Sequence, residues 1–97
     1  MPWRKAGLTI SDLAQAMANC DKLGLDAFRT QSHEDFQAAK NKYVELNGRG
    51  PYEARPLISA AHSIHYPHLP KLGPSDFQGS DAQDYLSKQH GFTLVEK

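Results

Sequence analysis

The sequence has a single cysteine, no long apolar run and no net charge. Cys20 is the only cysteine in 97 residues, so no internal disulfide can form and no pair of thiolates is offered to zinc. No apolar run approaches the roughly 18 residues of a membrane span, and residues 1–5 lead into no signal-peptide core. We therefore expect a cytoplasmic protein with no membrane partner.

Motifs for nucleotide binding and for nucleophilic catalysis are also missing. There is no G-x-x-x-x-G-K-[ST] or G-x-G-x-x-G loop and no G-x-S-x-G elbow. A chain of this length buries about 65% of its unfolded surface, which supports one core but no cleft between domains. We expect a single domain over residues 1–97, with residues 1–8 as a flexible arm, and neither enzymatic activity nor a cofactor.

The charge balance conceals a basic middle segment. Residues 1–39 carry four basic and five acidic side chains, and residues 72–97 carry two and four. Residues 40–71 carry five basic side chains against two acidic ones, a balance of +3. Such a cluster can face phosphates even in a neutral protein; the alternative is an ordinary solvated surface. The five cations are Lys40, Lys42, Arg49, Arg55 and Lys71.

The first third of the chain predicts two helices. Thr9 and Ser11 are capping residues, and apolar residues recur at helical spacing at Leu13, Met17 and Cys20. Gly24 is a plausible stop, after which a short second helix begins near Asp26 with Phe28 inward. The polar run 31–41 is either the end of that helix, extended by Phe36, or a surface loop.

The rest of the chain predicts a hairpin, two helices and a last strand. A strand over 42–46, an Asn-Gly turn over 47–51 and a short strand over 52–54 precede a helix that begins near Pro56. Prolines make 66–79 a loop, and Ser75-Asp76-Phe77 and Ser80-Asp81 supply caps for a helix that ends at Gly91. Residues 92–95 form a strand that pairs with the hairpin. This order predicts an α+β domain whose small antiparallel sheet packs with about four helices.

Three histidines stand at spacings of three: His62, His65 and His68. Such spacing suits a zinc site on a helix, but Pro67 breaks the helix and no cysteine or carboxylate completes the set. We expect no metal, with His62 as a satisfied core histidine and the other two on the surface.

The segment 47–62 is the best candidate for contact with DNA. Arg49 lies in the turn and Arg55 at the entry to a helix, whose free N–H groups favour anions. Tyr43 and Tyr52 could stack on a base or pack in the core; in the second case Arg55 pairs with Glu53 or Glu45. The predicted DNA-binding residues are Lys40, Lys42, Arg49, Tyr52, Arg55, His62 and Lys71.

The same segment resembles a known family. Residues 52–62 read Y-E-A-R-P-L-I-S-A-A-H and are similar to the Y-[DE]-x-[KR]-x-[IL]-x-x-x-A-H pattern of the N-terminal head domain of McrA-like (ScoMcrA-like), modification-dependent HNH endonucleases. Residues 21–28 and 72–79, with the ending 91–95, are similar to two further blocks of that domain. Pro56, Ile64 and Ser80 depart from the family pattern.

The resemblance implies a head domain that accompanies modified-DNA readers and an HNH nuclease in a bacterial restriction or antiviral defence system. The expected function is therefore noncatalytic DNA binding or sensing, with DNA, modified or plain, and a nuclease domain or subunit as partners. The alternative is a protein-interaction or oligomerisation module that positions a nuclease without touching DNA. A third reading, an autonomous hydrolase using the histidines, is simple to exclude by metal analysis.

Overall fold

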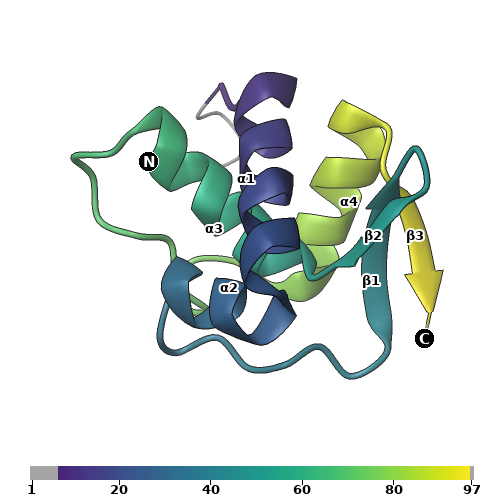
Figure 1. The fold of residues 1–97 in the computed structure, drawn as a ribbon, viewed down its shortest axis with the longest axis horizontal. Helices are drawn as coiled ribbons and strands as arrows, with labels where there is room; N and C mark the ends of the chain where they lie inside the picture. Colours follow the sequence, from purple (N-terminus) through teal and green to yellow (C-terminus); the bar gives the residue numbers. More distant parts are fainter. Residues whose placement is uncertain (1–6, 97) are drawn as a thin grey trace.

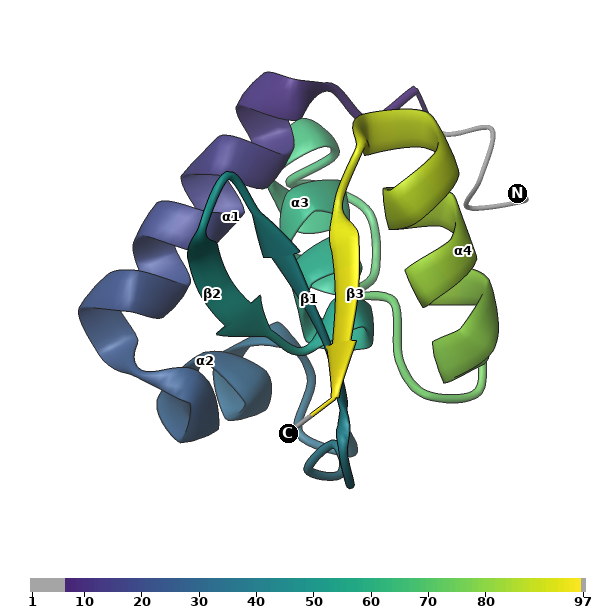
Figure 2. The ribbon, with the colours of Figure 1, turned by 90° about the vertical axis from the view of Figure 1, so that its right-hand side faces the viewer.

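The computed structural model describes residues 7–96, which form four helices and a three-stranded sheet. The elements in chain order are α1 (Ile10–Leu23), α2 (Leu25–Ser32), β1 (Lys42–Leu46), β2 (Arg49–Tyr52), α3 (Ala54–His65), α4 (Gly79–His90) and β3 (Thr93–Glu96). The predicted α+β class and order of elements are confirmed. The sheet forms one side of the molecule, and the helices lie behind it (Figures 1 and 2).

The sheet is antiparallel, with β1 between β2 and β3. Asn47 and Gly48 form the hairpin loop with φ angles of 53° and 79°, which suit an Asn-Gly turn. The prediction of a strand over 52–54 was wrong. Strand β2 starts at Arg49, directly after the turn, because an edge strand can hold Pro51 without losing an interior hydrogen bond. Ala54 already belongs to α3.

The helix ends follow the sequence signals except at α4. Thr9 and Asp12 form a reciprocal capping box at α1, and Gly91 ends α4 in the left-handed conformation. The predicted caps of α4 are wrong, because its N-cap is Gln78, which makes no side-chain cap hydrogen bond. Asp76 instead accepts a 2.7 Å hydrogen bond from the Gly73 N–H and closes a turn within the preceding loop.

Helix α3 is the centre of the core. It packs against α1, α2 and α4, and Leu57, Ile58 and Ala61 on it are fully buried. Helix α2 ends at Ser32, so Phe36 lies in the loop that follows and does not extend the helix. The Phe36 ring packs edge-on against the Phe77 ring, with the two ring centres 6.4 Å apart. The predicted arm at residues 1–8 lies largely outside the described residues, although Leu8 is buried in the core.

Truncation of Leu57 tests the central position of α3. Leu57→Ala is expected to lower the free energy of unfolding by about 3 kcal/mol, because a buried leucine leaves a cavity that the core only partly fills. Leu69→Ala removes the same atoms from a side chain that is 37% exposed and should cost less than about 0.5 kcal/mol. Urea unfolding measures both; equal losses would contradict this packing.

Candidate nucleic-acid interface

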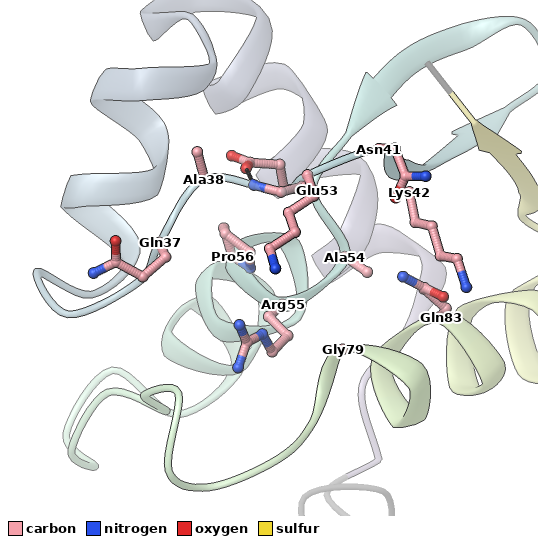
Figure 3. Close-up of a pocket in the computed structure, with 12 residues that line it drawn as sticks. Gln37, Ala38, Asn41, Lys42, Glu53, Ala54, Arg55, Pro56, Gly79 and Gln83 are labelled. Atoms are coloured by element: carbon pink, nitrogen blue, oxygen red, sulfur yellow. Dashed lines mark hydrogen bonds between the residues drawn. The ribbon is translucent and has the colours of Figure 1, made fainter.

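Three of the predicted phosphate-binding cations line one cleft. Lys40, Lys42 and Arg55 border a cavity of about 320 Å³ between the segment 37–42, the start of α3 and the first turns of α4 (Figure 3). Lys40 and Lys42 are exposed, and Arg55 is half-buried. The fold therefore brings together cations that are up to 15 positions apart in the sequence.

Two helix N-termini open onto this cleft. Ala54, the first residue of α3, and Gly79, the first residue of α4, both line it. Neither helix has a side-chain cap hydrogen bond at its N-terminus. The first N–H groups of a helix have no partner within the helix, and they carry the positive end of its dipole. The cleft thus combines three full positive charges with two partial ones.

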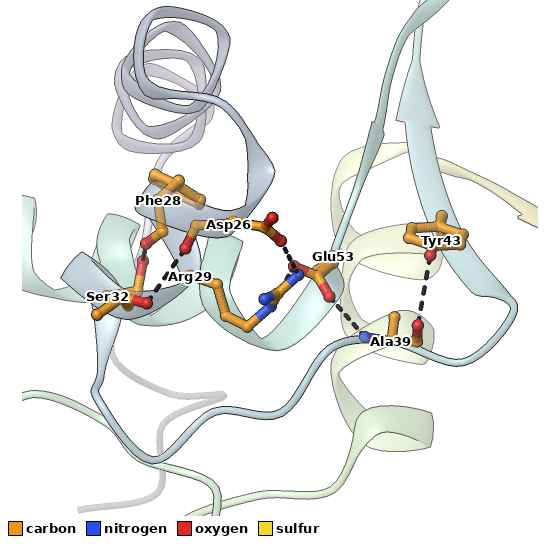
Figure 4. A network of polar contacts seen from close by, with 8 residues as sticks. Asp26, Phe28, Arg29, Ser32, Ala39, Tyr43 and Glu53 are labelled. Atoms are coloured by element: carbon orange, nitrogen blue, oxygen red, sulfur yellow. Dashed lines mark hydrogen bonds and ion pairs between the residues drawn. The ribbon is translucent and has the colours of Figure 1, made fainter.

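The acidic residue of the cleft, Glu53, has its charge engaged within the protein. Its side chain is 5% exposed, and its Oε1 accepts a 2.9 Å hydrogen bond from the Arg29 Nε–H (Figure 4). Its Oε2 accepts a 2.6 Å hydrogen bond from the backbone N–H of Ala39. Partial burial lowers the pKa of Arg29, but the hydrogen bonds and charges of Glu53 and Asp26 outweigh this effect and raise it. The negative charge of Glu53 is therefore balanced by the positive charge of Arg29, so it does not neutralise the three cations of the cleft.

Arg55 is held from behind by the loop that precedes α4. Its Nη1 donates a 3.5 Å hydrogen bond to the Pro74 carbonyl, and its guanidinium lies 5.7 Å from the centre of the Phe36 ring. The pairing of Arg55 with Glu53, one of the sequence alternatives, is not formed, because Arg29 occupies that carboxylate. The planar guanidinium thus lies at the cleft, and this group can bind a phosphate or a carboxylate at two points.

The structure does not bring Arg49 and Lys71 to the same cleft. Arg49 pairs with Asp21 at 2.8 Å and lies opposite Leu46 at the turn, whereas Lys42 lies at the other end of β1. Lys71 donates a 2.8 Å hydrogen bond to the Gln31 carbonyl. It lines a separate hollow of about 210 Å³ between α1, α2 and α3.

The predicted site residues Tyr52 and His62 lie in the core. Tyr52 is 2% exposed, so the part of the packing alternative that places it in the core is confirmed. Its hydroxyl donates a 2.8 Å hydrogen bond to Asp21, and burial together with that bond raises its pKa to about 12. His62 is 4% exposed, which confirms its core position. The expectation that it is satisfied was wrong, because its Nδ1 has no hydrogen-bond partner among the described residues.

The described part of the chain gathers no group of three side chains that could hold a metal ion. His65 pairs with Asp12 at 2.7 Å, and His68 is exposed. Cys20 is 3% exposed, and burial raises the pKa of its thiol to about 11, so the nucleophilic thiolate is rare at neutral pH. Between residues 7 and 96, no helix has the length and apolar character needed to cross a membrane.

The structure defines a small α+β module whose cleft is lined by three cations and two helix N-termini. The family model described as ScoMcrA-like, N-terminal head domain, matches residues 6–96, nearly the whole chain. The chain therefore belongs to the ScoMcrA-like N-terminal head domain family, the non-nuclease part of a restriction protein. No curated protein and no solved structure matches it.

Sequence reasoning missed Glu53 and Gln83 as residues of the cleft. The sequence suggested Glu53 only as a partner for Arg55, yet it is a buried carboxylate that binds two other segments. Acidic residues are common just before helices, so the position of Glu53 did not single it out. Its partner Arg29 lies 24 positions away, and no local pattern links the two residues. Gln83 lies one turn into α4 and reaches the cleft only because that helix starts beside α3.

Neutralising Glu53 tests its role in the cleft. Glu53→Gln is expected to lower the free energy of unfolding by about 3 kcal/mol, because it leaves the guanidinium of Arg29 without its buried partner. Asp26→Asn removes the other, 93% exposed partner of Arg29 and should cost less than about 1 kcal/mol. Similar losses for both variants in urea unfolding would show that Glu53 does not organise this region.

Acidification tests the buried ring of His62. Burial lowers the pKa of His62 from its ordinary value of 6.5; the neighbouring His65 acts in the same direction and Asp76 against it. The folded state thus favours the neutral ring, so its contribution to stability is complete above pH 6.5 and is lost as the pH falls through the folded-state pKa.

We expect His62→Leu to lose less stability than the wild type between about pH 7 and about pH 5. Burial lowers the pKa of His90 as well, but this effect is common to both proteins. The exposed control His68→Leu should keep the wild-type pH dependence. Parallel stability curves for wild type and His62→Leu would contradict the assignment.

Proposed function

We propose that this head domain is a noncatalytic DNA-binding or DNA-sensing module of a restriction or defence system, and that it binds DNA phosphates in the cleft at the N-termini of α3 and α4. The observation that carries the proposal is the convergence of Lys40, Lys42 and Arg55 on two uncapped helix N-termini. Anions bind at such termini, and lysine and arginine supply most of the affinity of proteins for DNA.

The three cations of the cleft suit a phosphodiester backbone, whose negative charges are closely spaced, more than a single acidic side chain of a partner protein. Arg55 is held in place by Phe36 and the Pro74 carbonyl, so its planar fork is aimed before binding. Lys40 and Lys42 are exposed, so their ammonium groups can contact neighbouring phosphates of the same backbone. Phosphate contacts position a protein on DNA but do not read its sequence. The module would thus hold DNA in the cytoplasm while a nuclease domain or subunit performs cleavage.

Fluorescence anisotropy with labelled duplexes tests this function. The wild type should bind with a salt dependence whose log–log slope is about −2.7, the value for three phosphate contacts. Lys40→Ala, Lys42→Ala and Arg55→Ala should each weaken binding and reduce the slope by about 0.9. Plain, methylated, hydroxymethylated and phosphorothioate duplexes show whether the module also senses modification.

Matched controls remove equal charges outside the cleft. Arg49→Ala controls for Arg55→Ala, and Lys71→Ala controls for Lys42→Ala; both should keep the wild-type slope. If the two controls weaken binding as much as the cleft variants do, the basic middle segment acts as a whole and the cleft is not the site. If neither a duplex nor a single strand binds at low salt, the proposed function is wrong.

A further inference from the structure

The cationic cleft continues into a second hollow along the sheet. This hollow has a volume of about 190 Å³ and lies between α4 and strands β1 and β3. Lys42 and Gln83 line both hollows, so the two hollows adjoin at these residues, and we call the pair of hollows the groove. Figure 3 shows both residues at the side of the first hollow. The groove begins at the two helix N-termini and ends at the edge strand β3.

The two parts of the groove have different chemistry. The first is cationic, whereas in the second Lys42 lies opposite the acidic Glu96 of β3, and the apolar Leu94 is part of the lining. Leu94 lies opposite Val44, so both side chains point to the same face of the sheet. Val44 is fully buried there, yet Leu94 is 51% exposed. The second hollow thus offers an uncovered apolar surface directly beside the cationic cleft.

A second phosphate does not suit this hollow, because Lys42 lies opposite Glu96 in the sheet and the lining therefore has no excess positive charge. A nucleobase suits it better. Its flat face can lie on the apolar side chain of Leu94, and its polar edge can bond to the amide of Gln83, which offers both donors and an acceptor. The carboxylate of Glu96 can accept a hydrogen bond from an exocyclic amino group.

We propose that the groove binds an unpaired nucleotide, with its phosphate in the cationic cleft and its base in the hollow lined by Gln83 and Leu94. This inference rests on the proposed function and specifies its substrate as single-stranded or locally unpaired DNA. In a duplex the bases are stacked inside the helix, so a base reaches a hollow beside its own phosphate only after it leaves the stack.

Anisotropy with one labelled strand, alone or annealed to its complement, tests the inference on the 97-residue chain. A duplex has the higher charge density, so purely electrostatic binding favours the duplex. The groove predicts the opposite order, with the single strand bound at least about threefold more tightly. A deoxynucleoside monophosphate should likewise displace the strand at a lower concentration than inorganic phosphate does.

Two variants and a matched control locate the effect. Leu94→Ala should abolish the preference for the single strand without changing duplex affinity or the salt slope. Gln83→Ala should abolish the preference as well, and because Gln83 carries no charge the salt slope should stay the same. Leu23→Ala truncates another exposed leucine, 42% exposed at the end of α1, and should bind as the wild type does. Thermal unfolding followed by circular dichroism verifies that all three variants remain folded.

The outcomes separate the two proposals. Duplex affinity equal to or above that of the single strand, or a preference that survives both groove variants, overturns the inference. If Lys42→Ala and Arg55→Ala still weaken duplex binding in that case, the proposed function stands. If neither the single strand nor the duplex binds at low salt, both the inference and the proposed function are wrong.

Discussion

The buried carboxylate of Glu53 is the interaction on which the site depends. It lies at the junction of β2 and α3 and binds the side chain of Arg29 from α2 and the backbone of Ala39 from the following loop. These contacts fix the loop that carries Lys40 and leads to Lys42, the first residue of β1, beside the start of α3. Because Glu53 and Arg29 compensate each other, a buried ion pair organises the cleft without cancelling its positive charge.

The same junction explains how a neutral protein can present a cationic surface. Positive charge concentrates where α3 and α4 begin, since both helices start at this end of the molecule without side-chain caps. Several other charged side chains are paired away from the cleft, as Arg49 is with Asp21 and Lys88 with Asp84. The balance of 11 basic and 11 acidic residues therefore says little about the local potential.

Local signals predicted the elements well, and long-range pairing limited the prediction of the site. The capping box at Thr9, the Asn-Gly turn and the stop at Gly91 each depend on a few neighbouring residues, so they could be read directly. The partners of Glu53 and the separation of Arg49 from Arg55 depend on how distant segments pack, which spacing does not encode. The family resemblance, carried by motif order, was confirmed by the match over residues 6–96.

The central claim is that DNA phosphates bind at the paired N-termini of α3 and α4. Titration of the isotopically labelled chain with a short oligonucleotide, followed by amide NMR, tests it most directly. The account predicts the largest shifts at the amides of Ala54 and Gly79 and along residues 39–42, because these N–H groups lie at the cleft. Shifts that centre on Arg49 or Lys71, or an unchanged spectrum at low salt, would contradict it.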